Sequence, residues 1–244
     1  MSLRVCAIVP TYNNPRTVGP IVEKLASHVE TVIVVDDGSA DAARAVLEQL
    51  ASRGATVVRR HERNRGKGAA IKTGLRAARE LGFSHALQVD ADGQHDLGDV
   101  PRFLAAANEA PESLILGHPV FDASVPPGRL RGRKVSIFWT TLETGGRIIA
   151  DPLCGFRVYP VEAALRAGAR GNRMEFDPEI AVRMIWSGCR VTNLPTRVRY
   201  LTTAEGGVSH FRMFRDNVWI SWGHTRLATL ALLRLATMRG LGPR

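Results

Sequence analysis

The sequence of 244 residues has few cysteines and no long apolar run. Its three cysteines, Cys6, Cys154 and Cys189, lie far apart without C-x-x-C spacing, which argues against a zinc knuckle or a disulfide framework and favours a reducing cytosol. The apolar stretch at residues 5–9 is too short for a signal peptide or a membrane span. We therefore expect a cytoplasmic protein.

Two widespread nucleotide-binding signatures are also missing. No G-x-G-x-x-G follows the first expected strand, which argues against a dinucleotide-dependent dehydrogenase. The Walker loop fails because His61 and Gly68 stand where that motif needs Gly and Ser or Thr. The chain has instead a Gly-Lys-Gly turn at an expected helix start, where glycines let the backbone approach a phosphate and Lys67 adds charge.

Acidic residues are scarce in the second half of the chain. Residues 1–125 carry 14 Lys and Arg against 15 Asp and Glu, a net charge of −1, whereas residues 126–244 carry 19 against 8, a net charge of +11. This asymmetry indicates an anionic partner on the second half, such as a phosphate, a membrane surface or a nucleic acid. A solvated basic face is the alternative.

The order of apolar stretches predicts an α/β fold. Short strands alternate with helical patterns over the first 117 residues, which predicts a parallel sheet whose ligands bind beyond the carboxyl ends of the strands. The expected strands are residues 5–9, 31–35, 55–58, 85–89 and 113–116, with helices near 21–29, 41–50 and 67–81 between them. Asp41 is the expected N-cap of the second helix.

A loop or subdomain edge is expected at residues 122–132, where prolines and Gly128 precede several arginines. Beyond it we expect a helix near residues 134–143, a strand at 155–159, a helix at 177–187, a strand at 190–200 and a long helix over 211–239. Asp177 followed by Pro178 is a suitable cap for the 177–187 helix.

Polar side chains follow three of the expected strands. The first strand ends at Pro10, and Tyr12 just beyond it could lie flat against a nucleobase, although the segment is also an ordinary turn. The second strand ends in Asp36 and Asp37, whose carboxylates can accept hydrogen bonds from base or ribose. A turn that caps a helix would explain Ser39 but not this acidic pair.

The strand at residues 85–89 leads into the turn Asp90-Ala91-Asp92. An acidic pair at i and i+2 can aim both carboxylates at one hard cation, and Mg²⁺ or Mn²⁺ held there would bridge two phosphates and neutralise a departing nucleotide diphosphate. The tripeptide alone is common by chance. Its weight comes from its position after an apolar strand, in a chain with acids after an earlier strand.

These motifs together resemble a family 2 glycosyltransferase with the GT-A fold. The resemblance is closest to the branch of dolichyl-phosphate mannose synthase and bacterial polyprenyl-phosphate glycosyltransferases. It covers about residues 3–212 and rests on motifs at residues 9–13, 34–39, 64–68, 90–95 and 151–157. It implies a Rossmann-like three-layer fold with a mainly parallel central sheet, and inverting transfer from a nucleotide-diphosphate sugar.

The resemblance also implies roles for the strand-end residues. Tyr12 and the Asp36/Asp37 pair would lie at the base and ribose. Asp90 and Asp92 would hold the metal and the diphosphate, with Gln94 next to the metal. The residues expected to bind the donor are Pro10, Tyr12, Asn14, Asp36, Asp37, Lys67, Asp90, Ala91 and Gln94.

The second half is then expected to bind the acceptor. In the resembling enzymes, basic residues after the fifth strand hold the acceptor phosphate, and residues 129–134 supply three arginines and a lysine there. Two departures, Cys154 where Ser is common and His210 where Lys is common, leave the identity of the acceptor open. The residues expected to bind it are Arg133, Lys134, Arg157 and Arg212.

The need for a general base depends on that acceptor. A phosphate monoester, whose second pKa is about 6, is already a competent nucleophile, whereas the hydroxyl of a lipid or pigment needs a base within reach. Asp151 is expected to orient the acceptor or take its proton, with Glu175 or Asp177 as alternatives. A turn acid before a proline is the other interpretation of Asp151. Asp92 is the second residue expected to act in catalysis.

Residues 212–239 mix Trp and Leu with Arg, and the arginines inside the apolar run argue against a membrane span. A basic helix of this kind is expected to lie among lipid headgroups, or else to pack on the catalytic domain or a second subunit. The expected organisation is a catalytic domain at residues 1–210, with a donor half at 1–125 and an acceptor half at 126–210, and a basic amphipathic helix at 211–244.

The expected partners are a nucleotide-diphosphate sugar, a lipid-linked acceptor and the anionic inner face of the cell membrane. A nucleic-acid-binding protein is the alternative from another class. It would exploit the basic half with steep salt dependence, but it leaves the acidic strand ends unexplained, so we expect no nucleic acid as a partner.

Overall fold

The computed structural model describes residues 3–52, 54, 56–146, 148–202, 205 and 213–240. A seven-stranded sheet runs through them in the order β3-β2-β1-β4-β6-β5-β7. The strands are β1 (Val5–Thr11), β2 (Val32–Asp36), β3 (Thr56–Arg60), β4 (His85–Gln88), β5 (Ser113–Phe121), β6 (Arg157–Pro160) and β7 (Arg190–Val198). The helices are α1 (Val18–Ala26), α2 (Asp41–Ala51), α3 (Lys67–Glu80), η1 (Leu97–Asp99), α4 (Val100–Glu109), α5 (Pro127–Thr144), α6 (Val161–Arg166), α7 (Phe176–Trp186) and α8 (Met213–Gly240).

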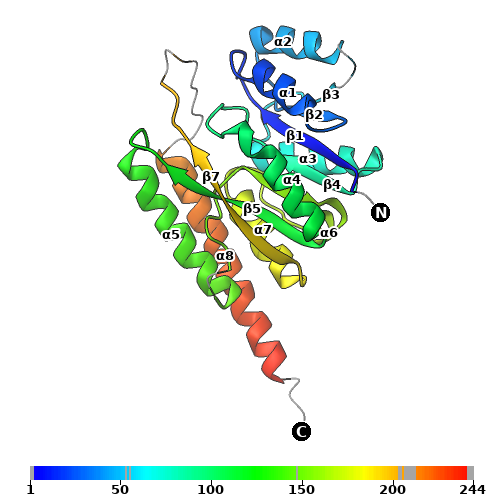
Figure 1. Cartoon of the computed structure of the whole chain (residues 1–244). Helices are drawn as coiled ribbons and strands as arrows, with labels where there is room; N and C mark the ends of the chain where they lie inside the picture. Colours follow the sequence, from blue (N-terminus) through cyan, green and yellow to red (C-terminus); the bar gives the residue numbers. More distant parts are fainter. Residues whose placement is uncertain are drawn as a thin grey trace.

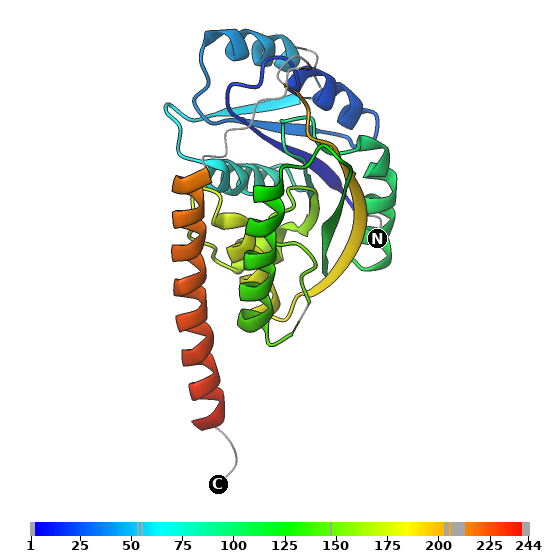
Figure 2. The ribbon, with the colours of Figure 1, turned by 90° about the vertical axis from the view of Figure 1, so that its left-hand side faces the viewer.

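Helices cover both faces of this sheet, which confirms the expected three-layer α/β fold (Figure 1, Figure 2). Helices α1, α2 and α4 share one apolar core with alternate strand residues such as Val9 and Leu87. Helices α3, α6 and α7 share the other core with the intervening residues, such as Ile8 and Ala86. The alternation follows from the period of two in a strand that is buried on both sides.

The direction of the strands decides which loops meet. Strands β3, β2, β1 and β4 are parallel, and Thr11 at the end of β1 lies opposite Asp36 at the end of β2. Strand β6 runs antiparallel between β4 and β5, so that its first residue, Arg157, lies opposite Gln88 at the end of β4. The segment before β6 therefore reaches the same edge of the sheet as the turns after β1, β2 and β4.

Some boundaries differ from the expected ones. The expected loop at residues 122–132 ends early, because α5 begins at Pro127 with extended Pro126 as its N-cap. A proline suits the first helical position, where its missing N–H would have no partner in any case. Helix α7 begins at Phe176 with Glu175 as its N-cap, so Asp177 is not the cap, and the N-cap of α2 is Ala40 instead of Asp41. Helices α4 and α6 were not expected.

Helices α5 and α8 lie side by side, and α8 runs on past the rest of the described chain (Figure 1, Figure 2). A buried pair joins them, with His224 Nδ1 2.9 Å from an oxygen of Glu143. Large apolar side chains are exposed on both helices, among them Phe138, Leu142 and Leu232. None of the helices in the described residues is long and apolar enough to cross a membrane.

Candidate active site

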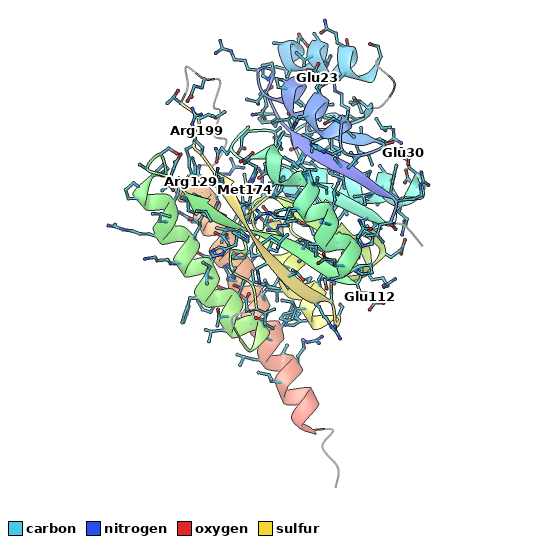
Figure 3. The ribbon with its side chains drawn as sticks, viewed as in Figure 1. Glu23, Glu30, Glu112, Arg129, Met174 and Arg199 are labelled. Carbon is cyan, nitrogen blue, oxygen red and sulfur yellow. The ribbon has the colours of Figure 1, made fainter. Side chains whose placement is uncertain are left out.

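A cavity of about 490 Å³ lies at the carboxyl edge of β1, β2 and β4, within the size range of small-molecule sites. The starts of α3, α5 and α8 and the segments before β6 and α7 complete its walls. Figure 3 labels two of its lining residues, Arg129 of α5 and Met174 before α7. All the residues expected to bind the donor line this cavity except Asp36, and Asp92 and Arg133 line it as well.

The turn after β1 is bound to the turn after β2. Asn13, in a left-handed conformation with φ of 53°, accepts a hydrogen bond from the backbone N–H of Ala40 and donates its own N–H to the Ser39 hydroxyl. Asn14 accepts a hydrogen bond from the N–H of Tyr12. These contacts hold Tyr12 at the cavity wall, where its ring is placed to meet a flat ligand.

The two acids after β2 have different positions. Asp36 is wholly buried and lies outside the cavity lining, because its carboxylate is 2.6 Å from the guanidinium of Arg60 and accepts the N–H of Ser39. The structure therefore does not bring Asp36 to the position expected beside the base and ribose. A buried carboxylate is normally paired in this way, and the sequence held no sign that Arg60, at the end of β3, would be the partner.

Asp37 lines the cavity, and both of its oxygens already have partners. They accept the backbone N–H groups of Arg65 and Gly66 at 2.8 and 2.7 Å, and His61 Nδ1 lies 2.7 Å from one of them. Asp37 thereby fixes the loop that leads into α3. Gly66 has a φ of 101°, and a Cβ there would overlap the carbonyl oxygen of Asn172, so only glycine fits.

Lys67, the first residue of α3, lies between two carboxylates. Its Nζ donates to Asp90 at 2.7 Å and to Asp177 at 2.8 Å. Burial alone would lower the pKa of Lys67, but the charges of Asp177 and Asp90 outweigh burial and raise the pKa above its ordinary value. The ammonium is therefore a fixed positive charge on the cavity wall, beside the acidic turn.

The turn after β4 presents both of its acids to the cavity. Asp92 accepts the N–H of Gln94 at 3.0 Å, which shapes the turn. Burial and the neighbouring Asp90 raise the pKa of Asp92 to about 6. Burial also acts to raise the pKa of Asp90, but the Lys67 ammonium prevails and lowers it. When both carboxylates are ionised, their negative charges attract a cation in addition to the Lys67 ammonium.

This pair fits a hard divalent cation. Mg²⁺ and Mn²⁺ take carboxylate oxygens and keep water and phosphate oxygens as other ligands, so two acids in one turn suffice. Gly155 passes so close that a Cβ there would overlap the Asp90 carboxylate, so the carboxylate has room in this position only because residue 155 is glycine. Among the described residues no group of three or more His, Cys, Asp and Glu side chains could hold a metal. The other ligands would have to come from substrate and water.

Two arginines of α5 face this acidic turn across the cavity. Arg129 and Arg133, one helical turn apart, both line it, whereas Lys134 is exposed and does not. Arg133 donates to Asp151 at 2.6 Å, and the other oxygen of Asp151 accepts the N–H of Leu153. Asp151 itself is buried behind Arg133, outside the cavity lining, so its geometry suits it to orient this arginine.

Arg157 lies away from the cavity, contrary to the expectation for an acceptor ligand. Its guanidinium is wholly buried and donates to the carbonyl oxygens of Cys154, Asp177 and Pro152 at 2.6 to 2.8 Å. Arg157 connects the segment before β6 to α7. Because its side chain is wholly buried, it cannot contact a substrate. Arg212, with the departure at residue 210, lies outside the described residues.

Several lining residues were not expected from the sequence. The first turns of α8 contribute Arg215, Asp216 and Ile220, and the loop before α7 contributes Arg173 and Met174. Only the basic, apolar pattern of α8 could have been noticed, and it pointed to a membrane. Of the residues considered as alternative bases, Asp177 lines the cavity but is bound to Lys67.

Comparisons with known proteins show the family of the chain. Residues 6–165 match the family described as glycosyl transferase family 2. UDP-N-acetylglucosamine–dolichyl-phosphate N-acetylglucosaminyltransferase of Methanococcus voltae is 25% identical over 79% of this chain and 84% of its own length. Polyprenol monophosphomannose synthase of Mycolicibacterium smegmatis is 30% identical over 84% of this chain and 80% of its own length.

A solved structure shares the fold. Glucosyl-3-phosphoglycerate synthase of Mycobacterium tuberculosis, in complex with Mn²⁺ and UDP-glucose, superposes with a TM-score of 0.65 at 17% identity, covering 91% of this chain and 79% of that one. The mainly parallel sheet of seven strands is of the GT-A type expected from the sequence. The chain belongs to glycosyl transferase family 2 and is a glycosyltransferase.

Proposed function

We propose that this enzyme transfers a sugar from a nucleotide-diphosphate sugar to a polyprenyl phosphate, with inversion and with a divalent metal. One observation carries the proposal: the carboxylates of Asp90 and Asp92 and the guanidinium groups of Arg129 and Arg133 line the same cavity. Such a cavity offers a cation site for one phosphate-bearing ligand and arginines for a second. The names of the two relatives, a dolichyl-phosphate and a polyprenol transferase, support this class of acceptor.

The donor half of the reaction follows from the strand ends. Asp90 and Asp92 would hold Mg²⁺ or Mn²⁺, which when bound neutralises the charge that builds up on the leaving diphosphate. Lys67 adds a positive charge on the same side, since its Nζ lies 2.7 Å from Asp90. Tyr12 and Asn14 border the part of the cavity next to Asp37, where a base and ribose would lie.

The acceptor half follows from α5. Guanidinium groups bind phosphate through paired, charge-assisted hydrogen bonds, and Arg133 is held in place by the buried Asp151. A phosphate monoester with a second pKa of about 6 attacks without losing a proton to the enzyme. One displacement from the face opposite the leaving diphosphate inverts the anomeric carbon. Asp151 then acts as a positioning residue, and no general base is required.

A hydroxyl acceptor remains the second candidate, because Asp177 is a cavity acid that could act as a base once Lys67 releases it. The two candidates separate in a transfer assay with a polyprenyl phosphate and the polyprenol of the same chain length. Transfer to the phosphate alone is expected. Transfer to the polyprenol at an equal rate would contradict the proposal.

The assignment of Arg133 has its own test. Arg133→Gln should lower kcat/KM for the phosphate acceptor by about 10- to 100-fold, since a hydrogen bond to a charged group is worth roughly 1.5–3 kcal/mol. Lys134→Gln removes one charge from the next residue, outside the cavity, and should lower it far less. Equal losses of kcat/KM in the two variants would mean that the acceptor phosphate does not bind at Arg133.

The location of the enzyme follows from its acceptor. We infer that α5 and α8, which carry exposed apolar side chains, lie against the anionic cytoplasmic face of the membrane, where a lipid-linked phosphate is presented. The basic half of the sequence, residues 126–244, contributes both helices. The division into a catalytic domain at residues 1–210 and a helix at 211–244 stays a proposal, as does the absence of a nucleic-acid partner.

A further inference from the structure

We propose that the protein has a second phosphate-binding site, outside the catalytic cavity. It is a pocket of about 330 Å³ between the loop before α7, the loop before α3 and one side of α8. Its lining includes four arginines and two tryptophans: Arg65, Arg170, Arg173, Arg226, Trp219 and Trp222. Of these, Arg173 also lines the catalytic cavity, so the two spaces share a wall.

The positive charge in this pocket is poorly balanced. Within the described residues, Arg65, Arg170 and Arg173 make no ion pair, and Arg226 pairs with Glu179 at 2.7 Å, a carboxylate that it shares with Arg183. The Nε of Arg226 is buried and has no hydrogen-bond partner among those residues. Like charges repel at short range, so arginines gathered in one concave space indicate an anionic ligand.

The one carboxylate in the lining already has a structural task. Glu175 is 8% exposed, and its Oε1 accepts the backbone N–H groups of Asn172 and Arg173 at 3.0 and 3.2 Å. It holds the loop that carries Arg170 and Arg173. A Cβ on Gly223 would lie 3.0 Å from the Glu175 Cβ, so α8 packs tightly on this loop. The backbone of this loop and the adjoining side of α8 are therefore held together without a ligand.

Phosphate is the anion that these side chains suit. Guanidinium forks match phosphate oxygens in geometry as well as charge. The two tryptophans, 42% and 61% exposed, stand beside the arginines on α8, and Trp is the side chain that typically lies at the depth of lipid headgroups. The phosphate could belong to an anionic phospholipid or be a small free phosphate.

Different side chains of α8 line the two spaces, although Arg215 of the catalytic cavity lies on the same stripe of the helix as the residues of the second pocket. Asp216, Asn217 and Ile220 line the catalytic cavity, whereas Trp219, Trp222 and Arg226 line the second pocket. The binding site does not rest on the proposed function, since none of its argument uses the transfer reaction.

The test uses the full chain and a matched pair of variants. Arg170→Gln removes one charge from the pocket, and Arg166→Gln removes one charge four residues away, from a side chain that is 71% exposed and outside the pocket. Binding is measured by sedimentation with vesicles of phosphatidylcholine alone or with phosphatidylglycerol added, and by calorimetry with inorganic phosphate. Unfolding midpoints check that both variants fold.

Arg170→Gln should weaken binding of the anionic probe about fivefold, as expected for one basic residue at a phosphate surface, and Arg166→Gln should leave it nearly unchanged. If the loss is confined to vesicles and Trp222→Gln also weakens vesicle binding, the source is a lipid headgroup. If inorganic phosphate shows the same dependence on Arg170, the source is a free phosphate.

Two results would overturn the site: equal losses for Arg170→Gln and Arg166→Gln, which indicate only the general field of a basic surface, or no binding of either anionic probe. The proposed function is judged separately. A protein that binds these probes without transferring sugar contradicts the transfer reaction and not this site. One that transfers sugar without binding them contradicts this site and, through the vesicles, the proposed contact with the anionic membrane, but not the transfer reaction.

Discussion

At the scale of single residues, Gly155 decides where the Asp90 carboxylate lies. A Cβ at residue 155 would overlap that carboxylate, so Gly155→Ala must push Asp90 out of its position. Since a displacement of about 1 Å can cost roughly 100-fold in rate, we expect transfer to fall by about that factor, with weaker Mn²⁺-dependent donor binding. Gly146→Ala, where a Cβ would meet nothing within 4 Å, is the control. Similar activities of the two variants would contradict the close fit around Asp90.

His85 offers a pH-dependent prediction. Burial lowers its pKa from the ordinary 6.5, and its ring lies between the Pro111 carbonyl, 2.8 Å from Nε2, and the Ser84 hydroxyl. The unfolded chain takes up a proton more readily, so this contribution to stability is complete above about pH 6.5 and is lost as the pH falls below it. His85→Gln removes the titrating group and keeps a donor for Pro111.

Urea unfolding between pH 7.5 and pH 5.5 measures the effect. The free energy of unfolding should fall more steeply with decreasing pH in the wild type than in His85→Gln. Other buried groups that titrate in this range, such as Asp92, are common to both proteins, so the difference isolates His85. Parallel curves would mean that His85 is not held neutral by its surroundings.

Single residues also show how far the sequence could predict the site. Asp90, Asp92 and Tyr12 line one cavity, as expected for acids and aromatics directly after apolar strands that meet at one edge of a parallel sheet, and their roles stay predictions. Asp36 and Arg157 were misplaced, since their burial depends on Arg60 and on backbone carbonyls brought from other elements. Long-range partners of this kind leave no local signal in a sequence.

At the scale of elements, the pattern of apolar residues predicted individual helices and strands but not the order of the strands in the sheet. The alternation of strands and helices was recovered from β1 to β4, where most strand residues are buried and the helices have one apolar face, whereas α4 was missed. The antiparallel insertion of β6 between β4 and β5 was not expected. Strand order depends on pairing between distant segments, and in this chain it brings the Asp151 segment to the acidic turn.

Helix α8 carries a prediction at this scale. Leu232 and Leu235 are 68% and 54% exposed on its distal half, away from the cavity residues near its start. The double variant Leu232→Gln/Leu235→Gln should bind anionic vesicles at least about tenfold more weakly, since burying each leucine is worth roughly 1.5–3 kcal/mol. Transfer to an acceptor dispersed in detergent should be retained.

Leu81→Gln is the control for that experiment, because Leu81 is also exposed but caps α3. Vesicle sedimentation of the three proteins decides the matter. If the double variant binds as tightly as Leu81→Gln, α8 does not contact the membrane, and packing against another subunit becomes the better interpretation of its apolar face.

At the scale of the whole molecule, charge is distributed unevenly along the chain, although both halves contribute strands to one sheet. The near-neutral half supplies the parallel strands β1 to β4 and the acidic turn, and the +11 half supplies β6, β7, α5, α8 and the arginines that line the same cavity. The charge asymmetry was visible in the sequence. The closure of the cavity by the start of α8 was not, since it depends on how a long helix packs against α5 and α7.

The central claim is that Asp90 and Asp92 bind a nucleotide-diphosphate sugar through a divalent metal. It is tested most directly by thermal unfolding of the wild type and Asp92→Asn with UDP- and GDP-sugars, with and without Mn²⁺. At a donor concentration about 100 times Kd, stabilisation of roughly 2.7 kcal/mol should raise the midpoint by about 5–10 °C. We predict this rise for one donor class, in the wild type and only with Mn²⁺. An equal rise without Mn²⁺, or in Asp92→Asn, would contradict the account.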